Sequence, residues 1–145
     1  MLVFELADDL PDIFLDEIQI EQVLLNLVRN SIDALQDNSA KPRQLSIHTH
    51  ITKAEEIQVT VHDNGSGIDE AKKDKILAPF FTTKVTGMGM GLSISRSIIE
   101  AHQGALSFSS QPDEGTRFYF SLPIINKTEL YKLTTFIPVK NKLYL

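Results

Sequence analysis

The chain has 145 residues, of which 42% are hydrophobic, and this is enough for one domain with a core of its own. Its formal charge of -5, its pI near 5.3 and the lack of any Lys/Arg run argue against nucleic acid or an anionic membrane surface as the main partner. The absence of cysteine excludes disulfides and thiolate metal sites, and no apolar run is long enough to span a bilayer. Because the N-terminus also lacks the charged start of a signal peptide, we expect a cytoplasmic domain.

The first half of the chain predicts a strand, a helix and a hairpin. Residues 2–6 read as a short strand, and a helix is expected from Asp16 to about Gln36. Asp16 and Gln19 have the spacing of an N-terminal capping pair, and apolar residues then recur at helical spacing. Residues 45–51 and 57–62 alternate and are rich in β-branched residues, which predicts an antiparallel hairpin with one buried face. His48 and His50 share one side of it, which favours a solvent-facing pair over a metal site.

The second half predicts a short charged helix, a longer helix and a final hairpin. The short helix covers residues 69–77, and the longer helix runs to His102, with Gly104 as its C-terminal cap. Strands are expected at 105–110 and 116–123, joined by a turn. The domain therefore covers residues 1–125, and residues 126–145 are expected to be a tail, a linker or an appended remnant.

The first helix carries a polar stripe in addition to its apolar one. Gln22, Asn26, Asn30 and Asp33 follow one another at spacings of four, four and three, so they lie along one line of the helix. Two readings remain open: a solvated helix face, or a row of oxygen ligands for a hard cation such as Mg²⁺.

A glycine-rich stretch precedes the second long helix. Gly87, Gly89 and Gly91 alternate and lead directly into the helix, so unshielded amides and the positive end of the helix dipole meet at one point. This junction is either a phosphate site or a plain chain reversal. Upstream, Phe80 and Phe81 stand beside Thr82, Thr83 and Lys84, a hydrophobic anchor with a polar edge that can also offer hydroxyls and charge to a phosphate.

A carboxylate stands at the end of the second hairpin strand. Asp63 is followed by Asn64, Gly65, Ser66 and Gly67. The segment is either an Asn-Gly turn with Asp63 as a local acceptor, or an adenine pocket in which Asp63 accepts a hydrogen bond from the exocyclic amine while the glycines let the ring approach the backbone.

These segments together resemble the four ATP-binding boxes of the sensor histidine kinase catalytic domain. Residues 22–34 match the N box, 63–67 the first G box, 79–84 the F box and 87–91 the second G box, and Gly115-Thr116 matches the last glycine signature. The resemblance covers residues 2–123 and is nearest to the nitrogen-regulation and oxygen-sensing kinases. The superfamily also includes gyrase, heat-shock chaperones and mismatch-repair ATPases.

The resemblance implies an α+β fold, the two-layer Bergerat sandwich, in which about three helices cover one face of a mixed, mostly antiparallel sheet. It implies that ATP and Mg²⁺ bind, that Asn30 ligates the metal with Asn26 beside it, and that Thr116 helps to hold a water on the adenine side. The expected nucleotide contacts are Asn30, Asp33, Asp63, Gly65, Gly67, Ile68, Phe80, Thr82, Thr83, Lys84, Gly87, Met88, Gly89, Met90, Gly91, Leu92 and Thr116.

The resemblance also favours phosphoryl transfer over hydrolysis. Hydrolysing relatives have a glutamate where this chain has Asn26, and an amide cannot deprotonate water. Asn26, Asn30 and Lys84 are therefore the expected catalytic residues of a kinase that donates the γ-phosphate to a histidine on a separate dimerising domain of the same protein, with a response regulator downstream. This domain alone is expected to be monomeric.

None of the four histidines begins the expected acceptor motif, so the chain alone is expected to phosphorylate itself poorly. Three alternatives stay open: a non-catalytic nucleotide-binding or interaction module, a gyrase-type ATPase, and a serine kinase of the anti-sigma type.

Overall fold

The computed structural model describes residues 1–36, 41–79 and 91–125. Their helices and strands are, in chain order, β1 (Leu2–Glu5), α1 (Glu17–Gln36), β2 (Leu45–Ile51), β3 (Glu56–Asp63), α2 (Glu70–Lys73), α3 (Gly91–Ala101), β4 (Ala105–Gln111) and β5 (Gly115–Pro123). The predicted strands are all present, and their ends agree within one residue. The expected boundary between a domain and a tail at residue 125 stays a prediction, because residues 126–145 lie outside the described part.

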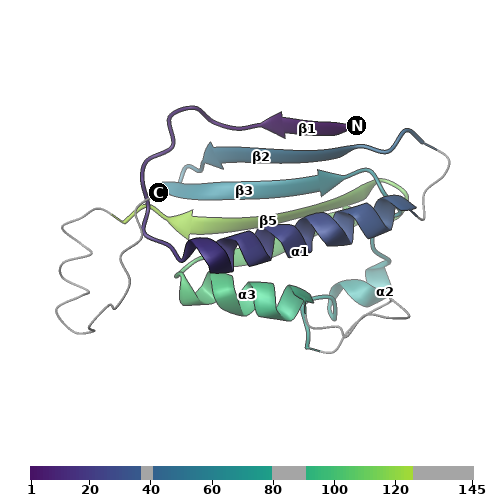
Figure 1. Ribbon diagram of the computed structural model, residues 1–145. Helices are drawn as coiled ribbons and strands as arrows, with labels where there is room; N and C mark the ends of the chain where they lie inside the picture. The colour runs from purple at the N-terminus through teal and green to yellow at the C-terminus, as the bar shows by residue number, and fades with distance from the viewer. Residues whose placement is uncertain (37–40, 80–90, 126–145) are drawn as a thin grey trace.

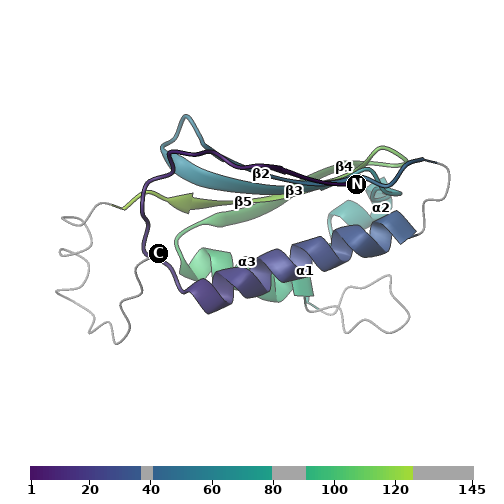
Figure 2. The ribbon, with the colours of Figure 1, turned by 45° about the horizontal axis from the view of Figure 1, so that its top comes forward.

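The five strands form one mixed sheet in the order β1-β2-β3-β5-β4. β1 pairs with β2 in parallel, and the other three pairs are antiparallel. Figures 1 and 2 show α1 and α3 side by side across one face of this sheet, with α2 near one end of the same layer. The predicted two-layer α+β fold is therefore confirmed.

The core lies between this helical layer and the sheet. Val23 and Leu27 of α1, Ile99 of α3 and Val61 of β3 have no exposed surface, and Phe120 of β5 has 1%. The apolar stripe of α1 and the alternation of β3 and β5 place these side chains on facing surfaces. Burying each one stabilises the fold by about 1.5–3 kcal/mol before entropy is counted.

A histidine joins the beginning of α1 to the end of α3. The predicted cap of α1 is confirmed, because Asp16 Oδ1 accepts a hydrogen bond from the Gln19 N–H at 3.1 Å. The Asp16 N–H in turn donates to His102 Nε2 at 3.0 Å, and His102 Nδ1 lies 2.8 Å from the Ile98 carbonyl oxygen. An accepting Nε2 leaves the proton on Nδ1, which donates to that carbonyl. His102 is therefore a structural link between the two helices.

The predicted extent of the short helix is wrong, whereas the end of the longer helix agrees within one residue. The helix expected at 69–77 is helical only over Glu70–Lys73, and bonds from Lys75 N–H to Lys72 O and from Ala78 N–H to Lys75 O continue it as separate turns before Pro79. α3 ends at Ala101, within one residue of the predicted end at His102. The Gly104 N–H caps it by donating to the Ile99 carbonyl oxygen at 2.9 Å, while the left-handed residue of the cap is Gln103, with φ of 60°. Gly104 stands one position later, where a Cβ would overlap with the Ser121 carbonyl oxygen, so close packing of α3 on β5 requires this glycine.

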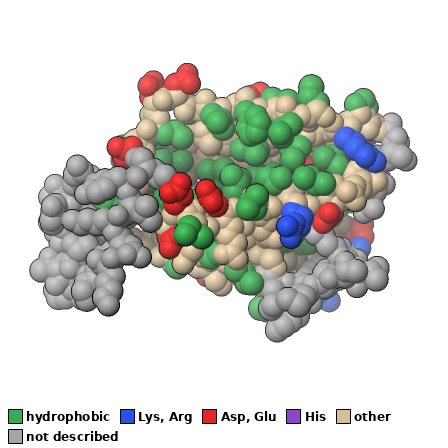
Figure 3. Space-filling view, viewed as in Figure 1, with side chains coloured by type: hydrophobic (Ala, Val, Ile, Leu, Met, Phe, Trp, Pro, Cys, Tyr) green, Lys and Arg blue, Asp and Glu red, His purple; other side chains and the backbone are tan. Residues whose placement is uncertain are grey.

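The helical layer leaves part of the sheet uncovered. Leu2 and Phe4 of β1 are 56% and 59% exposed, and Ile18, Leu25 and Ile32 of α1 are 74%, 68% and 44% exposed at intervals of seven residues. Figure 3, viewed from the helical side, shows hydrophobic side chains gathered over β1 and α1. The helical layer ends at α1, and β1 lies beyond it at the edge of the sheet (Figure 1).

Candidate functional site

Asp63 stands at the end of β3, under α1, and only 1% of it is exposed. Its Oδ1 accepts a hydrogen bond from the Gly65 N–H at 3.0 Å. Its Oδ2 is buried without a hydrogen-bond partner among the described residues, and the same is true of Ser31 Oγ. A buried oxygen that lacks a donor costs about 1–3 kcal/mol. The site thus fits a ligand that brings an N–H donor to this carboxylate.

Burial raises the pKa of the Asp63 carboxyl above 3.8. The Gly65 N–H, the nearby Ser31 hydroxyl, the Thr116 N–H and His62 all act in the opposite direction. Ser31 lowers the pKa of Asp63 through its proximity alone, because the Ser31 hydroxyl is not in hydrogen-bond geometry with any described group. The carboxyl is therefore held in a place that disfavours its charged form, and a bound donor would offset this penalty.

The glycines around Asp63 are required by packing inside the protein. A Cβ on Gly65 would lie 2.8 Å from the backbone of Ala34 in α1. Gly67 has φ of 73°, and a Cβ there would overlap with the Gln111 carbonyl oxygen. These contacts hold the turn after β3 against α1 and against the β4–β5 turn. They explain the two glycines without the predicted approach of a ring, which stays a prediction.

Thr116 is the cross-strand partner of Asp63 and is also buried. Its hydroxyl lies 2.9 Å from Ser110 Oγ, which in turn accepts a hydrogen bond from the Ile68 N–H at 2.9 Å. Ile68 packs partly buried against the core. The structure therefore brings Asp63, Gly65, Ile68 and Thr116 together at one end of the sheet.

Asn26 faces the first turn of α3. Its Nδ2 donates to Ser95 Oγ at 3.0 Å, and a Cβ on Gly91 would overlap with its Oδ1. Gly91 is therefore the residue that lets α1 and α3 approach here. The first N–H groups of α3, which have no partner within the helix, thus lie beside the Asn26 side chain.

Asn30 and Asp33 follow Asn26 along the same stripe of α1, and all three are half-buried. Each of Asn30 and Asp33 has an interaction within the protein. The reading of this stripe as a purely solvated face is therefore wrong. Leu92, expected as a nucleotide contact, packs partly buried against the core. The remaining expected contacts lie outside the described residues: Phe80, Thr82, Thr83, Lys84, Gly87, Met88, Gly89 and Met90.

Sequence reasoning missed two serines at this site. Ser31 has no exposed surface and stands beside Asp63, while Ser110 connects Thr116, Ile68 and the Gly115 carbonyl oxygen, to which its hydroxyl lies at 2.9 Å. Ser31 could have been found, because it occupies an apolar position of the α1 repeat. Ser110 gave a similar signal, because it follows Leu106 and Phe108 at the alternate positions of β4 that face the core.

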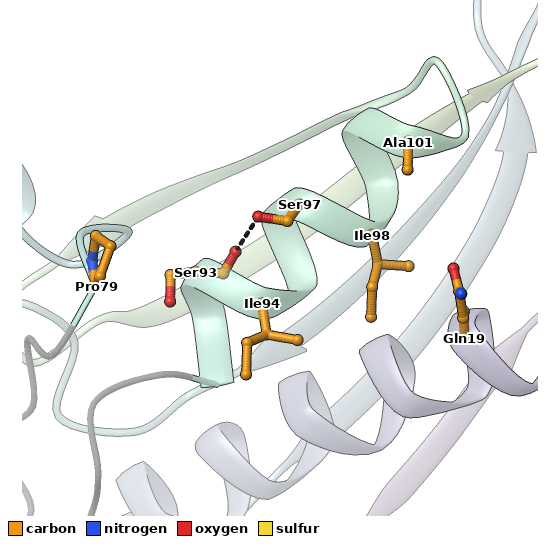
Figure 4. Close-up of a pocket in the computed structure, with 7 residues that line it drawn as sticks. All are labelled: Gln19, Pro79, Ser93, Ile94, Ser97, Ile98 and Ala101. Atoms are coloured by element: carbon orange, nitrogen blue, oxygen red, sulfur yellow. Dashed lines mark hydrogen bonds between the residues drawn. The ribbon is translucent and has the colours of Figure 1, made fainter.

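A groove of about 320 Å³ lies on the outer side of α3. Figure 4 shows Ile94 and Ile98 projecting from α3 toward Gln19 of α1, with Pro79 at the other end of the groove. Ile94 is 41% exposed. The groove begins within the first turns of α3, so an apolar surface stands next to the helix end that faces Asn26.

Comparison with known proteins identifies the family. Residues 15–126 match the family described as histidine kinase-, DNA gyrase B-, and HSP90-like ATPase. The chain belongs to this ATPase family. The predicted recognition is thereby confirmed, and with it an ATP-binding domain of the histidine kinase type.

Individual relatives are sensor proteins and a histidine kinase catalytic domain. The sensor protein TdiS of Thauera aromatica is 43% identical over 115 residues, and the sensor protein FixL of Bradyrhizobium diazoefficiens is 44% identical over 108 residues. These matches cover 79% and 74% of this chain but 21% of each relative. The solved, nucleotide-free catalytic domain of histidine kinase ThkA is 36% identical, with a TM-score of 0.70, over 84% of this chain and 77% of that one.

The chain therefore spans about a fifth of the sensor proteins TdiS and FixL, and it matches the catalytic domain of histidine kinase ThkA over most of that domain's length. In the described residues, no helix combines the length and apolar character needed to cross a membrane.

Proposed function

We propose that the chain binds Mg²⁺-ATP and donates its γ-phosphate to a histidine on a separate dimerising domain, as the catalytic domain of a sensor histidine kinase. The observation that carries this proposal is the buried Asp63 Oδ2, which lacks a donor among the described residues and is fixed at the end of β3. The exocyclic amine of adenine supplies such a donor. The similarity to the ThkA catalytic domain supports the same assignment.

The residue chemistry favours a phosphoryl donor over a hydrolase. Asn26 carries an amide in place of a base, and its Nδ2 is engaged with Ser95, so it cannot take a proton from water. The N-terminus of α3 next to it offers N–H groups that have no partner within the helix, and a positive dipole end, to phosphate. Asn30, one turn further along α1, would hold Mg²⁺ through its amide oxygen, and the metal would neutralise phosphate charge.

The acceptor domain needs a place to dock close to the phosphates. The groove beside Ile94 and Ile98 is apolar and begins next to the N-terminus of α3. A helix with an apolar face fits such a groove. We therefore assign the docking of the histidine-bearing domain to this side of α3, with a response regulator as the later partner.

Transfer of labelled phosphate tests the proposal. The chain is titrated with ATP by calorimetry and then mixed with an added histidine-bearing dimerisation domain. We expect binding, followed by acid-labile phosphohistidine on the added domain. Ile94→Asp is expected to bind ATP normally and to lose transfer, whereas Ile18→Asp, on the exposed side of α1, leaves both intact. Binding without transfer would identify a non-catalytic module, and rapid ATP hydrolysis without an acceptor would identify an ATPase.

Asn30→Ala tests the metal. We expect the affinity for Mg²⁺-ATP to fall about tenfold, or about 1.4 kcal/mol, while the affinity for ATP in the presence of EDTA changes little. The reason is that an amide ligand contributes only when the metal is present. Gln36→Ala, at the exposed last residue of α1, serves as the matched amide control. Equal losses with and without Mg²⁺ would assign Asn30 a structural role instead.

A further inference from the structure

The face of the sheet opposite the helices carries a polar groove of about 430 Å³. Its walls come from β2, β3, β4 and β5, and its titratable side chains are His48, His50, His62, Arg117 and Tyr119. None of the described residues that line it carries a carboxylate. The groove is separated by the sheet from Asp63 and the helical layer, so it does not belong to the nucleotide site.

Strand register explains how the basic groups meet. His62 of β3 and Arg117 of β5 are direct cross-strand partners, which places their Cβ atoms about 5 Å apart. Within the described part of the chain, Arg117 makes no ion pair. His48 differs, because its Nδ1 lies 2.9 Å from Glu5 Oε2 and its Nε2 lies 2.9 Å from Ser46 Oγ. The unpaired positive charge of the groove is thus centred on Arg117, with the His62 ring directly beside it.

The groups around His62 shift the pKa of its imidazole. Burial lowers its pKa below 6.5, Arg117 and His48 lower it further, and Asp63, on the other side of the strand, acts in the opposite direction. His62 is therefore neutral at pH 7. A negative group placed between His62 and Arg117 would favour the protonated ring, so its binding would take up a proton.

A metal ion does not fit the histidines of this groove. Across the described ranges, no group of three or more His, Asp or Glu side chains is placed to hold one. A long polyanion such as nucleic acid needs several Lys or Arg side chains in a row, and Arg117 is the only one among the described residues that line this groove. An anion that fits must be short and must present planar oxygen pairs, which the guanidinium of Arg117 can bind in a bidentate manner.

We propose that this groove binds the carboxylates of a short acidic segment of a partner protein, with Arg117 as the principal contact and the His62 and His50 rings as additional donors. The site is independent of ATP, because it lies on the opposite face of the sheet.

Titration with capped hexaglutamate tests this inference, and capped hexaglutamine is the uncharged control. We expect the full chain to bind hexaglutamate only, equally well with and without ATP, and Arg117→Gln to weaken binding about tenfold. Arg96→Gln, on α3 and paired with Glu100 at 2.8 Å, is the matched control and should leave the affinity unchanged. No binding, or equal binding by Arg117→Gln, would overturn the proposal, as would inorganic phosphate binding more tightly than hexaglutamate, which would indicate a site for free anions.

The pH dependence gives a second readout. Between pH 7.5 and 6.0 the glutamates stay ionised, so a gain in affinity on acidification reports protonation of His62, whose pKa is lowered in the free protein. We expect this gain, together with a higher pKa of His62 in the bound state, measured from its ring proton signals by NMR. An affinity that does not depend on pH over this range would contradict the assigned role of the imidazoles.

Discussion

Replacing Asp63 with asparagine is expected to lower ATP affinity by about 30- to 150-fold, which corresponds to about 2–3 kcal/mol. Asparagine keeps one oxygen, and the Gly65 N–H, which now bonds to Oδ1 at 3.0 Å, retains it. The NH₂ group then takes the place of Oδ2 and faces the adenine amine, so two donors oppose each other. Calorimetric titration with ATP measures the loss.

A change of nucleotide separates this effect from general damage. Inosine triphosphate carries an oxygen where ATP carries the amine, so it should bind Asp63→Asn better than ATP does, whereas the wild type should prefer ATP. Asp69→Asn, an exposed carboxylate that pairs with Lys72, is the matched control. If Asp63→Asn still bound ATP better than inosine triphosphate, Asp63 would not be the residue that accepts a hydrogen bond from the adenine amine.

The fold should tolerate this substitution. The pKa of Asp63 is raised in the folded state, so the folded protein holds this proton to a higher pH than the unfolded chain does. Ionisation of Asp63 therefore removes stability as pH rises from 3.8 through the raised value. Asparagine has no such charge, and at neutral pH the free energy of unfolding should change by less than about 1 kcal/mol, because the loss of a buried charge offsets an imperfectly paired amide.

Replacing Gly115 with alanine is expected to lower the free energy of unfolding by about 3 kcal/mol or more. Gly115 has φ of 100°, a conformation that L side chains rarely adopt, and a Cβ there would overlap with the Asp63 carbonyl oxygen on the neighbouring strand. The Cβ would be attached to the backbone of β5, and the carbonyl oxygen belongs to the backbone of β3. Because these two backbones are hydrogen-bonded partners, the strands would have to separate at Asp63 and Thr116. Urea denaturation followed by circular dichroism measures the change.

The neighbouring Glu114→Ala is the control for this measurement, since Glu114 is exposed in the same turn. It should leave stability within about 0.5 kcal/mol of the wild type. ATP affinity of any folded Gly115→Ala protein should also fall, because the position of Asp63 depends on this strand pair. A loss of stability below about 1 kcal/mol would mean that the turn can relax, and that the glycine is not required for the close approach of the two strands.

Local sequence signals predicted most of the fold. The alternation of residues 45–51 and 57–62 placed β2 and β3, and the Asp16/Gln19 pair placed the beginning of α1, because these patterns depend on neighbours within one or two turns. The end of α2 and the left-handed position after α3 were predicted wrongly for the same reason. A glycine after a helix predicts a left-handed cap, but here Gln103 takes that conformation and Gly104 is required by contact with Ser121.

The sequence by itself determined the family, the order of the elements and the position of Asp63 at the end of a strand. Only the tertiary structure decided that Asp63 Oδ2 is buried without a donor from the described residues, that Ser31 and Ser110 belong to this site, and that His62 and Arg117 stand side by side on the other face of the sheet. The physical reason is distance along the chain. Motif spacing reflects contacts within a few residues, whereas burial, cross-strand pairing and the close approach of a glycine to a distant carbonyl depend on how segments far apart in the sequence pack together.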